Sequence, residues 1–182
     1  RGIPMVVVAR DPNDPAFGAA VRRLRESGGY RTVDSNGGLA LRELLKALRR
    51  GDVVGILPDQ NAGDVFVPFF GVPAGVADGA ALLAYKTGAA LIPAFCLLQP
   101  DDTYRIVVRP AIPVDPAADR AAEVERVSRL FTREIEDAVR AHPEQYLWLH
   151  HRWKSAFEEK NCPRWPEGYD FDALRARWDA PL

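Results

Sequence analysis

The chain has 182 residues, of which 47% are hydrophobic and 27% are charged, and its formal net charge at pH 7 is −1. This length and composition are typical of one globular domain, or of most of one. A net charge so close to zero gives no sign of the basic face that nucleic-acid binding requires, so no nucleic-acid partner is expected. The longest apolar run, residues 88–98, is well short of the ~20 residues that cross a bilayer.

Strand and helix patterns alternate in the first third of the chain. Short β-branched runs predict buried strands, and apolar residues spaced by three and four predict helices. In chain order, the predicted elements are a strand over 3–9, a helix over 16–27, a short strand over 30–33, a helix that follows cap candidates at 34–36 and runs to 49, and a strand over 53–57.

An acid and an amide, Asp59 and Gln60, come directly after the last of these strands. Ligands of open α/β sheets bind at the carboxyl ends of strands, so both side chains are candidates for a substrate site. Asp59 could orient a partner or hold a sugar hydroxyl. The alternative is that Asp59 is a cap or turn residue, because residues 61–63, Asn-Ala-Gly, resemble a turn.

A long loop is predicted over residues 58–74, and it contains Phe66, Phe69 and Phe70. Loops generally run over the surface, so three aromatic rings in one loop exceed what loop packing requires. We interpret them as contacts for an acyl chain or a membrane, with core packing as the alternative.

The remaining pattern predicts a helix over 78–87, strands over 89–97 and 104–108 joined by a turn, a long amphipathic helix over 118–141, and a Trp- and Pro-rich tail with a short helix near 172–178. The predicted fold class is therefore α/β, a mostly parallel sheet flanked by helices with an antiparallel hairpin late in the chain. Residues 1–154 are expected to form one domain, incomplete at its N-terminus, and residues 155–182 an irregular tail.

Two cationic features stand out among the candidate site residues. Arg10 follows the first strand and suits a phosphate or carboxylate, unless it pairs with a nearby surface acid such as Asp14. The run from His150 to Lys154 is basic and aromatic. By itself it is compatible with a phosphate-binding patch, a membrane anchor or an ordinary helix end.

No general base can be assigned within the chain. The three histidines, His142, His150 and His151, have no carboxylate five residues later and no metal-ligand spacing. Cys96 and Cys162 are isolated, and Cys96 is expected to be a small buried hydrophobe. No catalytic residue, metal or cofactor is therefore assigned.

Four sequence blocks, taken together and in order, resemble the bacterial lipid A biosynthesis acyltransferases, a family within the glycerolipid acyltransferase superfamily. The blocks are residues 8–13, 51–60, 65–74 and 143–154. The chain departs from the family pattern at Ala9, where an aromatic residue is frequent, at Asp11, where Pro is frequent, and at His151, where Arg is common. These departures affect fine substrate contacts but not the class.

The resemblance implies a mechanism in which a histidine acts as general base on a hydroxyl, which attacks an acyl thioester on an acyl carrier protein. The family's His-x-x-x-x-Asp/Glu motif precedes the first block. The chain begins at Arg1 without Met, so the motif and a membrane anchor are expected upstream of it. This chain alone is then expected to be inactive.

The resemblance also implies partners and site residues. The partners are the acyl carrier protein, a lipid A precursor or other glycolipid acceptor, and a membrane surface, at the cytoplasmic face of the bacterial inner membrane. The implied substrate-binding residues are Arg10, Asn13, Asp59, Gln60, Arg152 and Lys154. The implied acyl-chain or membrane contacts are Phe66, Phe69 and Phe70.

Other functions remain open at this point. One is a phosphatidylinositol mannoside-type acyltransferase, which shares these blocks, and another is a non-catalytic lipid-binding domain. A nucleotide-binding Rossmann domain is disfavoured because no Gly-x-Gly-x-x-Gly follows a predicted strand.

Overall fold

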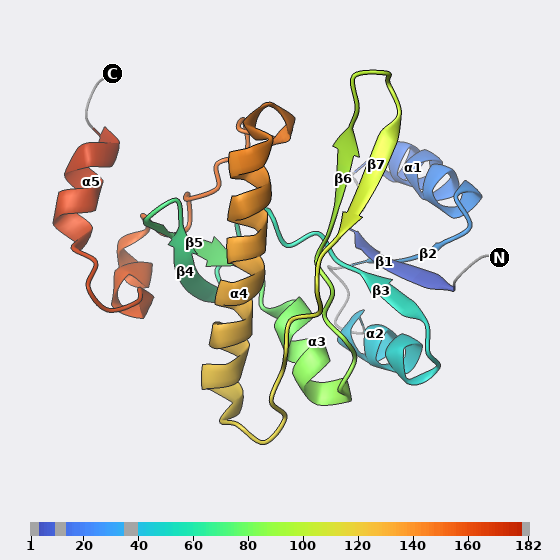
Figure 1. The fold of residues 1–182 in the computed structure, drawn as a ribbon, viewed down its shortest axis with the longest axis horizontal. Coiled ribbons are helices and arrows are strands. Elements are labelled where there is room, and N and C mark those ends of the chain that lie inside the picture. Colours follow the sequence, from blue (N-terminus) through green and yellow to red (C-terminus); the bar gives the residue numbers. More distant parts are fainter. Residues whose placement is uncertain (1–3, 10–13, 35–39, 180–182) are drawn as a thin grey trace. The chain divides into compact units, whose positions relative to one another are not determined.

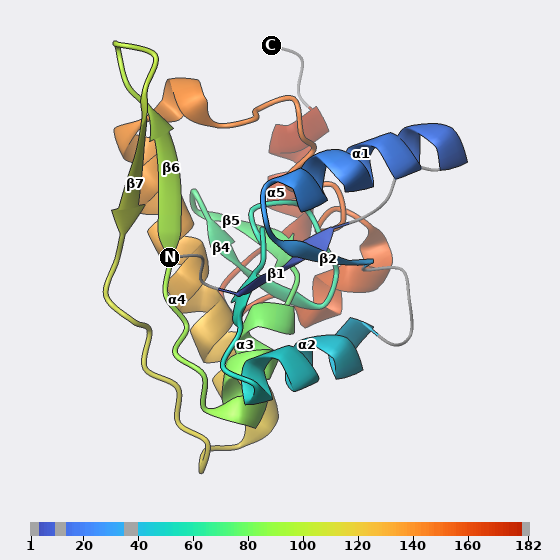
Figure 2. The same ribbon diagram turned by 90° about the vertical axis from the view of Figure 1, so that its right-hand side faces the viewer.

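The computed structural model describes residues 4–9, 14–34 and 40–179, and the chain divides into two compact units, residues 1–57 and residues 58–182. Figures 1 and 2 show the helices and strands of both units in two views. Two predicted site residues, Arg10 and Asn13, lie outside the described residues. In the part of the chain that is described, no helix is long and apolar enough to span a bilayer.

The first unit is built on a parallel sheet of three strands in the order β2-β1-β3. Its elements are β1 (Met5–Ala9), α1 (Pro15–Ser27), β2 (Arg31–Asp34), α2 (Ala40–Arg49) and β3 (Val53–Gly55). Central β1 pairs Val8 with Val33 of β2 and Val6 with Val54 of β3. The buried apolar residues are Val6, Val33, Leu44 and Ala47. This unit confirms the predicted parallel sheet with helices between its strands.

Local sequence explains where α1 begins. The Asp14 carboxylate accepts a hydrogen bond from the Phe17 N–H at 2.7 Å, which satisfies one of the free donors of the first turn. Pro15 takes the first helical position, where a missing N–H costs nothing.

The second unit is organised around its longest helix. Its elements are β4 (Val65–Phe69), β5 (Val72–Val76), α3 (Gly79–Thr87), β6 (Ala94–Leu98), β7 (Tyr104–Val108), α4 (Arg120–Ala141), the 3₁₀ helices η1 (Pro143–Gln145) and η2 (Glu159–Arg164), and α5 (Phe171–Asp179). The long helix α4 packs against β4 and α3 (Figure 1). Its buried apolar residues are Val124, Val127, Phe131, Ile135 and Val139.

The predicted loop over residues 58–74 is wrong in its second half, which forms the antiparallel hairpin β4–β5. A two-residue turn of Phe70 and Gly71 joins the strands, and both residues have positive φ angles, 52° and 75°. Hairpins favour such turns, usually with Asn-Gly. Here the Phe70 N–H donates to the Glu136 carboxylate at 2.7 Å, which helps hold an unusual backbone for a phenylalanine. Pro68 in β4 obscured the strand pattern, because proline is rare within sheets.

The predicted hairpin late in the chain is confirmed as β6–β7. One face of it is apolar and exposed, with Leu98 opposite Tyr104 and Cys96 opposite Ile106. Cys96 is exposed, so its predicted burial is wrong. The cause is strand alternation: Cys96 shares a face with Leu98, and none of the described residues covers that face.

The C-terminal tail contains the predicted short helix, observed as α5, and it is packed more closely than expected. Ala156, Phe157 and Asn161 are buried. The ring of Phe157 stacks on Trp178 of α5 at 4.8 Å between centroids. Trp178 also packs edge-on against Trp153 at 6.1 Å, so aromatic packing joins the tail to the rest of the second unit.

Candidate functional site

The second and fourth sequence blocks meet in the second unit, although about 90 residues separate them. The Arg152 guanidinium donates hydrogen bonds to the backbone carbonyls of Gly75 at 2.5 Å and Gln60 at 3.2 Å. It also lies over the Phe69 ring, 5.1 Å from the ring centroid. Arg152 therefore links the segment after β3 to the hairpin β4–β5.

Arg152 is buried, with 1% of its surface exposed. Burial lowers its pKa from the usual value, while the neighbouring Tyr146 and Asp59 act in the opposite direction. A buried cation is costly unless it is compensated, and here two carbonyl oxygens and an aromatic face supply part of the compensation, while Nε and Nη2 have no hydrogen-bond partner among the described residues. The arrangement fixes the backbone of Gln60.

Two other side chains, His150 in the fourth block and Ser155 directly after it, hold the residues that follow Gln60. The Asn61 N–H donates to His150 Nε2 at 2.6 Å. The Ser155 hydroxyl lies 2.6 Å from Asn61 Oδ1 and 2.5 Å from the Ala62 carbonyl, and it can donate its single proton to either. Asn161 supports Ser155 from behind by donating to the Ser155 carbonyl at 2.7 Å.

We call His150, Arg152 and Ser155 the clamp, because each binds the segment from Gln60 to Ala62. Gly75 lets the clamp close. A Cβ at this position would lie 1.9 Å from the Ala62 carbonyl oxygen and 2.3 Å from Ser155 Oγ. Only glycine allows β5 to approach so closely.

The clamp and Tyr146 together hold backbone atoms of the predicted substrate-binding residues Asp59 and Gln60. The Asp59 carbonyl accepts a hydrogen bond from the Tyr146 hydroxyl at 3.2 Å, and burial raises the pKa of that tyrosine. Asp59 is half-buried and Gln60 is exposed. Their side chains are therefore not needed to anchor this segment. Both remain predicted substrate contacts.

Arg152 and Lys154 differ in their surroundings. Lys154 is exposed, as a contact for an anionic group would be. Arg152 has almost no surface left for a ligand, and its hydrogen bonds go to backbone carbonyls. A direct substrate contact of Arg152 stays a prediction that its burial does not support.

The three predicted aromatic contacts also differ in how much of their surface is exposed. Phe66 and Phe69 have 3% and 0% of their surface exposed and belong to the core. The surface loop on which their predicted lipid contact depended is instead the buried strand β4. Phe70, at the turn, is half-buried and lies beneath the Arg140 guanidinium at 4.6 Å. A contact with acyl chains stays a prediction that the exposure supports for Phe70 alone.

The histidines show no arrangement of a general base oriented by a carboxylate like that of the family motif. His150 Nε2 accepts the Asn61 N–H, so its lone pair is already used. His142 lies 3.8 Å from the exposed Glu144, two residues later. Among the residues that the structure describes, no group of His, Cys, Asp and Glu could hold a metal ion.

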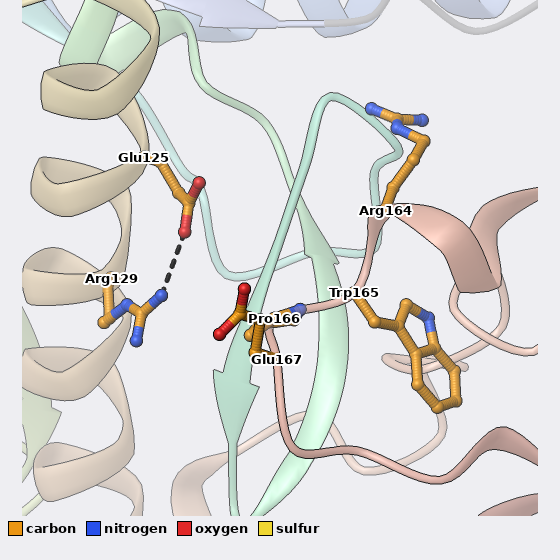
Figure 3. A pocket seen from close by; sticks show the side chains of 6 residues that line it. All are labelled: Glu125, Arg129, Arg164, Trp165, Pro166 and Glu167. Carbon is orange, nitrogen blue, oxygen red and sulfur yellow. Dashed lines mark hydrogen bonds and ion pairs between the residues drawn. The ribbon is translucent and has the colours of Figure 1, made fainter.

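A surface pocket of about 450 Å³ lies between α4 and the segment after η2 (Figure 3). Its lining residues are Glu125, Arg129, Arg164, Trp165, Pro166 and Glu167. Both cations in it have partners within the chain: Arg129 pairs with Glu125 at 2.9 Å, and Arg164 donates to the Asp64 carbonyl. No predicted site residue lines this pocket.

Sequence reasoning missed Asn61, Ser155 and Gly75 as parts of the site. Asn61 and Gly75 each had a weak signal, since one directly follows Asp59-Gln60 and the other directly follows the third block. Ser155 had none, because a serine after a basic run is ordinary. Its role depends on Asn61 and Ala62, which are more than 90 residues away.

Comparison with known proteins identifies the family of the chain. Residues 1–155 match the sequence model of a family described as bacterial lipid A biosynthesis acyltransferase. The lipid A biosynthesis lauroyltransferase of Escherichia coli (strain K12) is 36% identical over 123 residues, which are 63% of this chain and 38% of that protein. The lipid A biosynthesis palmitoleoyltransferase of the same organism is 28% identical over 157 residues, which are 84% of this chain and 49% of that protein.

A lipid A biosynthesis acyltransferase of Haemophilus influenzae is 32% identical over 137 residues, covering 71% of this chain and 41% of that protein. The chain thus spans less than half the length of these curated relatives. The family match covers all four blocks and every residue of the clamp. The chain belongs to the bacterial lipid A biosynthesis acyltransferase family.

Proposed function

We propose that the protein transfers a fatty acyl chain from an acyl carrier protein to a hydroxyl of a lipid A precursor. One observation supports this most directly: the family match covers residues 1–155 and includes the clamp, which with Tyr146 fixes the Asp59–Gln60 backbone. The names of the relatives, lauroyltransferase and palmitoleoyltransferase, agree with acyl transfer. The proposed location is the cytoplasmic face of the bacterial inner membrane.

In this proposal the clamp positions a substrate site and does not carry out the chemistry. Arg152 fixes the Gln60 backbone from beneath, so that the Asp59 and Gln60 side chains contact the acceptor in a constant geometry. Lys154, which is exposed, binds an anionic group of a substrate, and Arg10 and Asn13 bind a phosphate.

The general base in this proposal is a histidine that is not among residues 1–182. The bond from Asn61 to His150 Nε2 supports this, because it occupies the nitrogen that would otherwise accept a proton. The 182-residue chain alone is therefore expected to bind substrates without transferring an acyl group.

The test compares this chain with a longer protein that contains it and includes a His-x-x-x-x-Asp/Glu motif. Both are incubated with acyl-loaded acyl carrier protein and a lipid A precursor, and the product is measured by mass spectrometry. We expect transfer by the longer protein only, and a loss of about tenfold or more in its Asp59→Asn variant. Lys160→Ala, an exposed lysine paired with Glu158, serves as the control.

Two outcomes would contradict the proposal. Transfer by the 182-residue chain alone would show that the base lies within it. Transfer by the longer protein to a mannoside phospholipid, but not to a lipid A precursor, would reject the proposed acceptor.

A further inference from the structure

Three consecutive apolar residues, Leu147, Trp148 and Leu149, are exposed immediately before the clamp. Their exposed fractions are 60%, 50% and 89%. We call these three residues the apolar tip. They follow α4 and η1 in the orange part of the ribbon (Figure 1). Three large apolar side chains in a row at the surface mark an interaction site more often than chance exposure does.

The apolar tip is held in place by hydrogen bonds within the chain. The Trp148 indole N–H donates to the Pro143 carbonyl at 2.7 Å, and the Trp148 backbone N–H donates to the Tyr146 carbonyl at 2.9 Å. The His150 N–H donates to the Leu147 carbonyl at 3.1 Å. These donors therefore need no water, which lowers the cost of moving the tip into an apolar medium.

Aromatic ring contacts lead from the apolar tip to the side chain of Arg140. Trp148 packs edge-on against Tyr146 at 5.0 Å and lies 6.1 Å from the Phe70 ring. Arg140 in turn lies over Phe70 and keeps much of its side chain exposed. Of the three cations in residues 140–154, Arg140 and Lys154 are exposed and Arg152 is buried. Arg140 also pairs with Glu136 at 2.7 Å.

We propose that the apolar tip docks on the surface of an anionic phospholipid bilayer. Tryptophan favours the membrane–water interface, leucine side chains enter the acyl region, and nearby cations are attracted by anionic head groups. This inference rests on the proposed function, because it would place the clamped Asp59–Gln60 segment at the surface from which a lipid acceptor comes. It moves the expected membrane contact from the buried Phe66 and Phe69 to the residues before the clamp.

The exposed face of the β6–β7 hairpin is the competing apolar surface, and its chemistry fits a bilayer poorly. Over residues 94–109 the acids Asp101 and Asp102 balance Arg105 and Arg109, so the charges of the hairpin give no net attraction to anionic head groups. Its sheet has only two strands, so each strand has an edge without a strand partner. Open sheet edges are avoided in lipid. The hairpin therefore provides the matched control.

The test is co-sedimentation of the 182-residue chain with vesicles of phosphatidylcholine and phosphatidylglycerol in a 3:1 ratio. We expect binding that weakens with pure phosphatidylcholine and with added salt. Leu147→Ser combined with Leu149→Ser should weaken binding by roughly tenfold to a hundredfold. The control, Tyr104→Ser combined with Ile106→Ser, should bind as the parent chain does. The single variant Leu149→Ser changes the most exposed residue and should fold normally while showing part of the loss.

No binding to these vesicles, or equal binding by the apolar-tip variants, would overturn the proposal. Loss of binding in the hairpin variant instead would assign the lipid surface to β6–β7 and would also overturn it. The assay contains no acyl donor, so its result is independent of transfer. Vesicle binding by this chain together with no transfer by the longer protein would refute the proposed function and leave the docking surface intact.

Discussion

At the scale of single residues, the candidate site depends on contacts too tight to accept other side chains. Gly75 and Arg152 show two kinds of such tight contact. Gly75 matters for the space that its missing side chain leaves, and Arg152 for the two carbonyl oxygens that it binds. Both act on the segment from Gln60 to Ala62, which contains no helix or strand of its own. Side-chain hydrogen bonds and the bond from the Ala62 N–H to the Gly75 carbonyl at 3.1 Å hold this segment instead of a sheet ladder.

Gly75→Ala should destabilise the second unit by about 3 kcal/mol, toward the upper end of overpacking costs. The added Cβ would meet a backbone oxygen at 1.9 Å, and backbone cannot move aside as a flexible side chain can. Urea denaturation followed by circular dichroism measures the change. Gly63→Ala is the matched control, because nothing lies within 4 Å of its Cβ position, and a shift under about 0.5 kcal/mol is expected. Equal stability of the two variants would show that β5 does not need this close approach.

At the scale of elements, α4 shows how a helix start is stabilised by charge. The Asp119 carboxylate caps the helix by accepting from the Ala122 N–H at 3.0 Å. Glu123, in the first turn, accepts from the Arg126 guanidinium and from the Asp115 N–H. These bonds lower the pKa of Glu123 from about 4.5 to about 2. Negative charge at a helix N-terminus is also favoured by the helix dipole.

The depressed pKa gives the stability contribution of Glu123 a defined pH window. The ionised form stabilises the fold fully above about pH 4.5, and the contribution is lost as the pH falls toward 2. Glu123→Gln should therefore cost roughly 1 kcal/mol at pH 7, a modest value because Arg126 is half exposed. Denaturation midpoints of the parent and variant should converge as the pH falls from 4.5 toward 2. A difference that stays constant over that range would rule out the ionised carboxylate as the source.

A matched variant on the same helix separates this effect from a general loss of charge. Glu125→Gln removes an exposed carboxylate whose partner is Arg129, four residues later. Exposed pairs of this spacing contribute about 0.3–0.5 kcal/mol. A loss as large as that of Glu123→Gln would contradict the special role of Glu123 in the first turn.

At the scale of the whole molecule, the tail is part of the second unit's packing. Ser155 supports the clamp, and Phe157 is buried against rings of Trp165 and Trp178. The expected division into a domain over residues 1–154 and a tail over residues 155–182 stays a prediction. The buried contacts of residues 155–161 argue for testing it by truncation.

A chain that ends at Lys154 should lose several kcal/mol of stability, because removal of one buried phenylalanine alone typically costs about 3–5 kcal/mol. Thermal unfolding followed by circular dichroism would show a lower or absent transition. A chain that ends at Gly168 keeps Ser155 and Asn161 but lacks Phe171 and Trp178, so an intermediate loss is expected. If the chain ending at Lys154 unfolds like the full chain, the tail is dispensable and the predicted boundary is right.

Sequence by itself determined the elements whose signals are local. The helices, the parallel strands of the first unit and the hairpin β6–β7 follow from periodicity and from turn residues. The four blocks were sufficient to identify the family, because their order and spacing can be read directly from the sequence. Local sequence did not reveal β4, since Pro68 and a Phe-Gly turn resemble a loop.

Only the tertiary structure decided what the site residues do. Arg152 could be read as a surface cation until its burial and its two carbonyl partners were known. Phe66 and Phe69 could equally have been surface rings. The apolar tip had no signal beyond hydrophobicity, since sequence cannot tell an exposed leucine from a buried one. The physical reason is common to all three: burial depends on residues far away in the sequence, such as α4 for β4 and Gln60 for Arg152, and local patterns do not record such contacts.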